Sequence, residues 1–411
     1  MHGRTSKDAL GVDGAEGWRR NLWVCVAGSF TTLIGMTLLL PFLPIYVEHL
    51  GAHGAFDVAW WSGVSYAVTF LAAAIVAPLW GRLGDRYGRK QTLLRASLGM
   101  AVAISLTGLA RNVGELVALR ALTGLLGGYA SGATILIAGG TPRDRSAWAL
   151  GVLASGSMAG GLLGPLVGGL LPPLIGIRAT FMLSGGLILA AFAATALLIV
   201  EDKAGVRRPL GSRAQPEDVD RPIVARMLAA GSLLTFANFS IEPVLTIYVG
   251  SLVADRGHVI TFAGVVMAAA ALGSILAAPR VGRLTDRLGP RRVIVTGLLA
   301  ASVLMALQAM VATEWQLLAL RFLMGVALGG LLPSISSVIR SSVPDRSLGT
   351  VLGLSTSAQY AGQVAGPLMG GFVGGMYGPR AVFLATSVVM AGGAMLVLTT
   401  RLRRSRRNGA D

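Results

Sequence analysis

Long apolar runs follow one another along almost the whole chain, and short polar connections separate them. A helix needs about 20 predominantly apolar residues to cross a lipid bilayer. Only 13% of the 411 residues are charged, whereas a soluble domain carries about 25%. We therefore expect an all-α membrane protein. Twelve membrane-spanning helices are predicted, at 21–47, 59–80, 92–110, 113–138, 146–171, 178–200, 223–249, 259–279, 292–312, 315–339, 347–375 and 379–400.

The basic residues are distributed unevenly among the connections. Alternate connections and both terminal segments carry most of the 35 Lys and Arg residues. The connections on the other side carry only Arg111, Arg178, Arg256 and Arg380. Because cytoplasmic loops are enriched in Lys and Arg, we expect both termini to lie in the cytoplasm. The formal charge of +16 reflects this asymmetry and does not indicate nucleic-acid binding.

A charged stretch between the second and third spans recurs in the second half of the chain. Residues 81–90 read GRLGDRYGRK, and residues 282–292 read GRLTDRLGPRR. Arg120 is matched by Arg321 at the same offset of 201 positions. Internal repeats of this kind build paired bundles around a central path in many transporters. The expected parts are a cytoplasmic segment (1–20), a six-helix bundle (21–200), a cytoplasmic linker (201–222), a second six-helix bundle (223–400) and a basic tail (401–411).

A glycine-proline pattern recurs in the same way in spans five and eleven. Small residues let two helices approach closely, and a proline bends a helix. We therefore predict close-packed, pliant helix contacts at both places, although packing without any gating role would leave the same pattern. The residues are Gly160, Gly164, Pro165, Gly168, Gly169, Gly366 and Pro367.

These patterns resemble those of the major facilitator superfamily over essentially the whole chain. The stretch 81–90 is similar to that family's signature between helices two and three, and 116–124 (LVALRALTG) is similar to the helix-four motif of proton-coupled members. The glycine-proline pattern of 160–169 resembles that of drug/proton antiporters. The stretches 43–48 and 148–151 look most like bacterial multidrug efflux pumps of the MdtG type. The resemblance implies two pseudo-symmetric six-helix bundles.

The charged stretch is predicted to be a tight loop that acts as a cytoplasmic gate, because so charged a stretch cannot lie in hydrocarbon. Asp85 would open the turn, and Gly88 can adopt a positive φ. A carboxylate can sit at the positive end of a helix from the opposite bundle, which would place Asp85 near Ser347 and Asp286 near Ser146. The alternative is that these charges only fix orientation. The candidate gate residues are Gly81, Asp85, Arg86, Gly88, Arg89 and Asp286.

Charged residues within spans are few, and they are usually functional because burying them is costly. Glu242 is the one acidic residue clearly inside a predicted span, with Asn238 one helical turn away. Pro243 beside it lacks a backbone donor and predicts a local break in the helix. We predict a proton or cation site at Glu242, unless the carboxyl lies at a solvated outer rim. Arg120 and Arg321 should point inward. The resemblance implicates Arg120 in proton coupling, and the alternative is that helix carbonyls hold it.

The resemblance places a substrate pocket among helices one, four, seven and ten. Aromatic and methionine side chains with few fixed donors suit varied lipophilic molecules, although such residues are also typical of ordinary packing. The candidates are Phe30, Met36, Tyr129, Phe236, Asn238, Phe322, Tyr360 and Gln363. No metal site is predicted, since Gly51 and Gly54 would interrupt any helix that carries His49 and His53.

The sequence favours a proton-driven exporter of lipophilic drugs, with no cofactor and no phosphate-binding loop for ATP. Its expected partners are lipophilic small molecules, protons and the lipid bilayer. We expect a monomer in the bacterial plasma membrane. The first alternative is a proton-coupled symporter or exporter of one defined metabolite, which would need fixed polar contacts. A polytopic enzyme or receptor is more distant, since the four histidines lie at termini or outer connections.

Overall fold

The structure is a computed structural model that describes residues 9–142, 144–200 and 221–398. Within these ranges every regular element is a helix, and the expected all-α fold is confirmed. The predicted linker (201–222) and basic tail (401–411) lie almost entirely outside the described residues, as do the first eight residues of the N-terminal segment.

The N-terminal half contains eight helices that build six spans. Their bounds are α1 Ala9–Thr37, α2 Leu43–His49, α3 Ala55–Tyr87, α4 Arg89–Thr107, α5 Val113–Leu126, α6 Tyr129–Gly140, α7 Ser146–Ile175 and α8 Ile177–Leu198. The C-terminal half repeats this order with one extra turn of 3-10 helix. Its elements are α9 Arg221–Ser240, α10 Glu242–Leu252, η3 Arg256–His258, α11 Val259–Leu288, α12 Pro290–Gln308, α13 Glu314–Leu328, α14 Leu331–Ser341, α15 Asp345–Tyr377 and α16 Pro379–Leu398.

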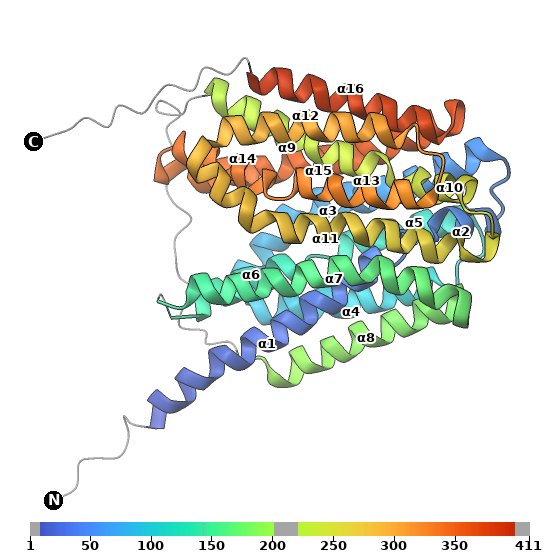
Figure 1. Ribbon diagram of the computed structural model, residues 1–411. Coiled ribbons are helices and arrows are strands. Elements are labelled where there is room, and N and C mark those ends of the chain that lie inside the picture. The colour runs from blue at the N-terminus through green and yellow to red at the C-terminus, as the bar shows by residue number, and fades with distance from the viewer. Residues whose placement is uncertain (1–8, 143, 201–220, 399–411) are drawn as a thin grey trace, which may run out of the picture.

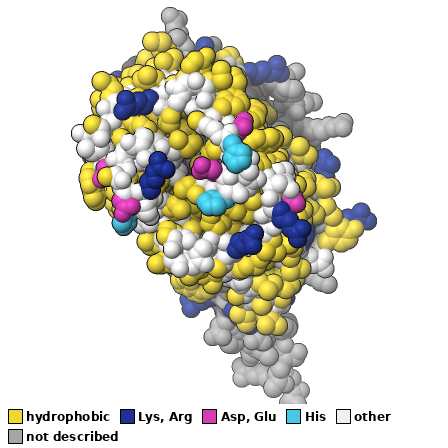
Figure 2. Space-filling model, turned by 90° about the vertical axis from the view of Figure 1, so that its right-hand side faces the viewer, with side chains coloured by type: hydrophobic (Ala, Val, Ile, Leu, Met, Phe, Trp, Pro, Cys, Tyr) yellow, Lys and Arg dark blue, Asp and Glu magenta, His cyan; other side chains and the backbone are white. Residues whose placement is uncertain are grey.

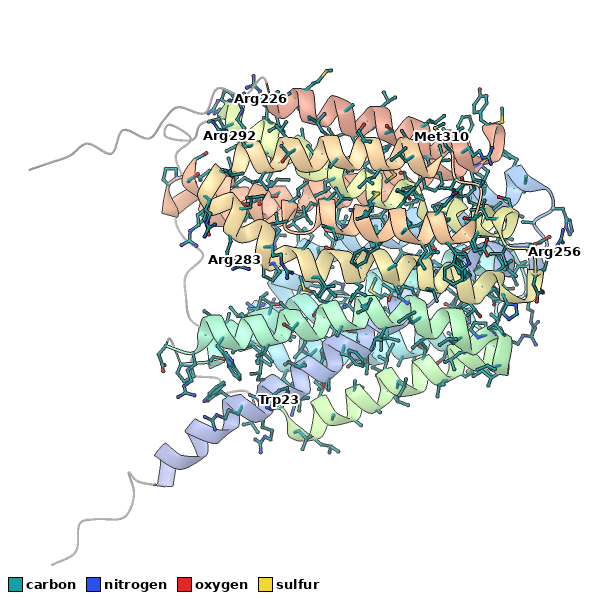
Figure 3. The ribbon with its side chains drawn as sticks, in the orientation of Figure 1. Trp23, Arg226, Arg256, Arg283, Arg292 and Met310 are labelled. Atoms are coloured by element: carbon teal, nitrogen blue, oxygen red, sulfur yellow. The ribbon has the colours of Figure 1, made fainter. Side chains whose placement is uncertain are left out.

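The two halves form two bundles of roughly parallel helices that lie side by side (Figure 1). Within the described residues, nine segments are apolar and long enough to cross a membrane. Four described helices fall outside this set but pack against it, namely α1, α2, α4 and α15. They complete the twelve predicted spans. Arg226, Arg283 and Arg292 lie at one end of the molecule and Arg256 at the other (Figure 3). We call these the basic end and the opposite end.

Spans four and ten are each interrupted at a pair of glycines. Helix α5 ends before Gly127 and α13 before Gly329, and the next residues, Gly128 and Gly330, have φ of 106° and 86°. Only glycine adopts this conformation readily. The sequence predicts continuous helices here, because glycines inside an apolar run can adopt either a helical φ or a positive φ.

Spans one and seven are also interrupted, each beside a proline. Span one turns at 38–42, around Pro41, and span seven breaks at Ile241, next to Pro243. A proline cannot donate a backbone hydrogen bond, and its ring clashes with the preceding turn of helix. A local break beside Glu242 was expected for this reason, and it is confirmed.

The charged stretch 81–90 is not a loop, which corrects the sequence-based expectation. Helix α3 runs on to Tyr87 and α4 begins at Arg89, so the whole turn is the single residue Gly88, with φ of 100°. Gly289 makes the equivalent turn with φ of 85°. At 1.5 Å per residue the 33 residues of α3 extend about 50 Å, longer than the hydrocarbon core. The charged residues can therefore project from helix ends.

Close contacts between the two bundles concentrate toward the opposite end. Gly63 lies against the carbonyl oxygen of Pro367, and Gly264 lies against that of Pro165, so that an added Cβ would collide with the backbone at both positions. The Thr246 hydroxyl donates to the carbonyl oxygen of Pro41 across the same boundary, at 2.8 Å. We call this set of contacts the closed seam.

The glycines of α7 and α15 nearer the basic end make no such approach. A Cβ added at Gly151 or Gly349 would meet no described atom within 4 Å. Among the described glycines, close contacts between the bundles are therefore found toward the opposite end.

Candidate functional site

The interruption of span seven places a carboxyl group between the two bundles. Glu242 is the first residue of α10, directly after the break at Ile241. Its Oε2 atom is completely buried and has no hydrogen-bond partner among the described residues. Other atoms of the side chain retain some exposure. A carboxylate that is buried without a hydrogen bond is costly, which marks this position as a candidate functional site.

Three further polar side chains are linked to this carboxyl group, directly or through one another, by electrostatic interactions. Arg321 of α13 lies within electrostatic reach of Glu242, and so does Tyr66 of α3. Tyr66 in turn lies within electrostatic reach of Arg120 of α5. Arg120, Arg321 and Tyr66 are only 4%, 3% and 1% exposed. We call these four residues the buried cluster. Two of them belong to each bundle.

The buried cluster is connected to the interruption of span one. The Tyr66 hydroxyl donates a hydrogen bond to the carbonyl oxygen of Leu40, at 3.1 Å. Leu40 is also the residue that occupies the position of Glu242 in the N-terminal repeat, 202 positions earlier. The two arginines are therefore repeated and the carboxyl group is not. Ionised, the cluster contains two positive charges and one negative charge.

The charges of the buried cluster are held loosely. The Nε atoms of Arg120 and Arg321 are buried without a hydrogen-bond partner. No ion pair of 4.0 Å or less is found between Glu242 and either guanidinium, although all three residues are described. The alternative in which helix carbonyls hold Arg120 has no such hydrogen bond to support it here. A change of charge at Glu242 will thus be felt by Arg321 with little local screening.

The predicted gate residues lie at the basic end. Gly88 forms the turn with the expected positive φ, Gly81 lies within α3, and Arg86 stacks on Tyr87, with its Cζ 5.5 Å from the ring centroid. Arg89 is the first residue of α4.

The two gate carboxylates are placed less completely. The side chain of Asp85 lies outside the described part of the structure. Asp286 is exposed, and no hydrogen bond or ion pair to it is found among the described residues. The predicted pairings with the helix starts at Ser347 and Ser146 remain predictions.

The glycine-proline residues of α7 bring helices together within one bundle and between bundles. Gly160 and Gly168 lie directly against the backbone carbonyls of Phe30 and Leu38 on span one, and Gly164 lies against Thr37. The C-terminal bundle repeats this arrangement, with Gly366 against the carbonyl of Phe236 on α9. Gly169, Pro165 and Pro367 face the other bundle at the closed seam.

Most of the predicted pocket residues are partly buried side chains on the expected spans. Phe30, Met36, Phe236, Asn238, Phe322, Tyr360 and Gln363 all retain some exposure. Tyr129 differs from them. It is 1% exposed, and its hydroxyl is 2.8 Å from that of Thr195 in the core of the N-terminal bundle. In this conformation Tyr129 packs inside its own bundle.

Two features of the site were missed from the sequence. Tyr66 gave no signal, because an isolated tyrosine in an apolar run is ordinary packing material. Arg95 of α4 could have been found from the sequence, since it is a charged residue within a predicted span. Its guanidinium lies 3.4 Å above the Trp80 ring centroid and donates to the carbonyl oxygen of Gly127 at 3.1 Å. It therefore joins three spans at the interruption of span four.

Comparison with known proteins agrees with this architecture. The family model described as Major Facilitator Superfamily matches residues 25–257 and 227–411. The chain belongs to the major facilitator superfamily, a family of secondary transporters. It is 39% identical over 397 residues to the multidrug resistance protein MdtG of Serratia proteamaculans, which covers 96% of this chain and 97% of that one. The MdtG of Escherichia fergusonii is 39% identical over 386 residues, covering 92% and 93%.

Solved structures share the fold at low sequence identity. A bacterial homologue of the human lysosomal transporter Spinster, in an inward-facing and occupied conformation, has a TM-score of 0.75 at 16% identity and covers 92% of this chain and 95% of its own. A single-residue mutant of the nucleoside transporter NupG has a TM-score of 0.74 at 13% identity and covers 91% and 99%. The resemblance drawn from the sequence motifs is thereby confirmed.

Proposed function

We propose that this protein exports lipophilic drugs in exchange for protons, by alternating access of a path between its two bundles. The relatives of about 39% identity carry the name multidrug resistance protein. The observation that carries proton coupling is the carboxyl group of Glu242, whose buried Oε2 atom has no hydrogen-bond partner among the described residues and which lies within electrostatic reach of the buried Arg321.

Proton binding at Glu242 would act on the interface between the bundles. Protonation removes the only negative charge of the buried cluster and leaves Arg120 and Arg321 on opposite sides of the interface without a compensating charge. Like charges at low dielectric repel strongly, so protonation favours conformations in which the bundles separate at this depth. Loss of the proton restores the attraction. Each proton bound or released thus shifts the balance between the two access states.

The direction of transport depends on which end of the molecule faces the cytoplasm. We infer from the Lys and Arg distribution that the basic end and both termini face the cytoplasm of a bacterial cell, in its plasma membrane. The closed seam then blocks the outward path, so this conformation opens to the inside. Asp85 and Asp286 would close the basic end in the other conformation. The transporter would work as a monomer.

The alternative function is transport of one defined metabolite. A selective site needs a fixed set of polar groups. Of the candidate pocket residues, only Tyr129, Asn238, Tyr360 and Gln363 carry such groups, and Tyr129 packs inside its own bundle. The aromatic and methionine majority favours drug export.

Dye retention in cells distinguishes these functions. Cells that express the protein should retain less of a lipophilic fluorescent dye than cells with an empty vector, and a protonophore should abolish that difference. The Glu242→Gln variant should behave like the empty vector, whereas Glu48→Gln, which changes an exposed acid outside the cluster, should export normally. Protonophore-insensitive export, or full activity of Glu242→Gln, would contradict the proposal.

A further inference from the structure

A crevice of about 870 Å³ lies at the opposite end, and both bundles line it. The N-terminal bundle contributes His49, Pro172, Pro173 and Arg178, and the C-terminal bundle contributes a short segment at Arg256–His258 that leads into α11. Figure 2 looks onto this end, where basic side chains stand among apolar ones. Arg256 lies at the end of the molecule opposite Arg283 and Arg292 (Figure 3), so the crevice is separate from the predicted gate.

At the repeat-related contact between the bundles, where α3 packs against α15, aromatic side chains fill the space. Phe56, Trp60 and Phe372 form a three-ring cluster with centroids 6.2–6.4 Å apart, and Phe56 packs directly on Gly375. The internal repeat relates this contact to the crevice. The repeat-related positions carry Gly257, Thr261 and Leu170, each smaller than the aromatic residue it replaces. Of these three, Gly257, which replaces Phe56, lines the crevice.

The crevice also has positive charge that is not neutralised. Among the described residues, no hydrogen bond or ion pair is found for the side chain of Arg178 or of Arg256, and the lining contains no acidic residue. The nearby Glu115 accepts hydrogen bonds from the Arg111 amide at 2.8 Å and the Asn112 side chain at 3.1 Å. The Glu115 carboxylate is therefore engaged by hydrogen bonds at the start of α5 and does not pair with the arginines of the crevice.

The acid next to Arg256 is engaged in the same way. Asp255 accepts from the Gly257 amide at 2.8 Å and lies 2.9 Å from Nδ1 of His258. These hydrogen bonds lower the pKa of the Asp255 carboxyl group. Arg256 therefore stays available to an anion from outside the protein.

The outer wall of the crevice continues into a lipid-facing surface. Leu170 and Leu174 are one turn apart on α7, next to Pro172 and Pro173, and are 50% and 76% exposed. Arg178 lies just inside the start of α8, at the end of a span where lipid headgroups are found. Apolar surface below and unpaired arginines above match a molecule with an acyl chain and an anionic phosphate.

We propose that this crevice binds an anionic phospholipid of the surrounding bilayer. Its phosphate contacts Arg178 and Arg256, and an acyl chain lies along Leu170 and Leu174. Because the two arginines belong to different bundles, the bound lipid joins them. The bound lipid fills the space between the bundles at the crevice, as the aromatic cluster fills the space between α3 and α15. It thereby favours the conformation in which the opposite end is closed.

Lipid binding to the purified full-length protein tests this inference. Native mass spectrometry would measure the bound fraction on titration with phosphatidylglycerol, with phosphatidylcholine as the neutral comparison and glycerol 3-phosphate as the headgroup without tails. The wild type should bind one phosphatidylglycerol more tightly than the rest. The Arg178→Ala/Arg256→Ala variant should bind it about tenfold or more weakly, because charge-assisted hydrogen bonds are lost.

Two further variants keep the test decisive. Arg111→Ala/Arg380→Ala removes two charges from the same end outside the crevice, and it should retain the wild-type affinity. Gly257→Phe restores the ring found between α3 and α15 and keeps both arginines, and it should lose the tight site. The inference is overturned if the control loses as much affinity as the crevice variant, if phosphatidylcholine or glycerol 3-phosphate binds equally well, or if Gly257→Phe retains the site.

Discussion

At the scale of single residues, the buried cluster combines one carboxyl group that the internal repeat lacks with two arginines that it repeats. Arg120 and Arg321 occupy equivalent positions in the two halves, whereas the partner of Glu242 in the repeat is Leu40. A symmetric scaffold thus acquires an asymmetric charge. Both guanidinium groups and the Oε2 atom of Glu242 are buried, so in our proposal the charge state of Glu242 is the variable to which the fold responds.

The stability of charge variants should report this balance. At alkaline pH, where the carboxyl group is ionised, Glu242→Gln leaves two buried cations uncompensated and should destabilise the protein by about 1–3 kcal/mol, less than the loss seen when a close buried pair is broken. Adding Arg321→Gln should recover most of this loss. Thermal unfolding of the purified proteins measures both. Losses that simply add in the double variant would show that the two residues do not interact.

Tyr66 should matter for transport more than for stability. Tyr66→Phe removes the hydroxyl that connects the cluster to Leu40, and we expect a severalfold loss of proton-driven export. Tyr46→Phe is the matched control, since its buried hydroxyl also donates to a backbone carbonyl, that of Thr107 at 2.7 Å. Each change should cost about 1 kcal/mol of stability. Equal losses of transport in the two variants, measured as dye efflux, would argue for packing alone.

At the scale of elements, four interrupted spans and the glycine contacts position the site. The interruptions of spans one and seven bring Leu40 and Glu242 to the boundary between the bundles. The closed seam depends on backbone approaching backbone, at Gly63 with Pro367 and at Gly264 with Pro165.

A small side chain in the closed seam should open it. Gly63→Ala places a methyl group against the Pro367 carbonyl, and overpacking of this kind costs about 1–3 kcal/mol. A cysteine introduced at Thr246, which is buried at the boundary between bundles, should then react faster with a thiol reagent. Gly161→Ala is the control, because an added Cβ there meets nothing within 4 Å. Unchanged labelling in Gly63→Ala would show that the contact between Gly63 and Pro367 does not keep the opposite end closed.

The elements also show where sequence reasoning succeeds and where it stops. Pro243 beside Glu242 predicted the break in span seven because a missing amide donor is a property of the residue itself. The breaks at Gly128 and Gly330 depend on backbone angles that a glycine permits but does not require. The polarity of the charged stretch 81–90 predicts a loop, since charged residues cannot lie in hydrocarbon. A helix longer than the membrane is thick can carry the same charges beyond the membrane, and polarity alone does not distinguish the two. Tyr66 joins the site only through tertiary packing.

At the scale of the whole molecule, the two ends have different roles in the proposal. The basic end is assigned to the cytoplasm, and the closed seam lies at the other end. A cysteine at Asp286 should therefore react with a membrane-impermeant reagent in inside-out vesicles only, and a cysteine at Arg111 in intact cells only. The reverse pattern would invert the orientation and, with it, the direction in which this conformation opens.

Proton exchange by the reconstituted protein tests the central claim most directly. Purified protein in liposomes, with a pH-sensitive dye inside, should move protons across the membrane when a lipophilic drug is added on one side, and the Glu242→Gln variant should bind the drug without moving protons. Drug-dependent proton movement that persists in Glu242→Gln at the wild-type rate would show that the buried carboxyl group is not the coupling site.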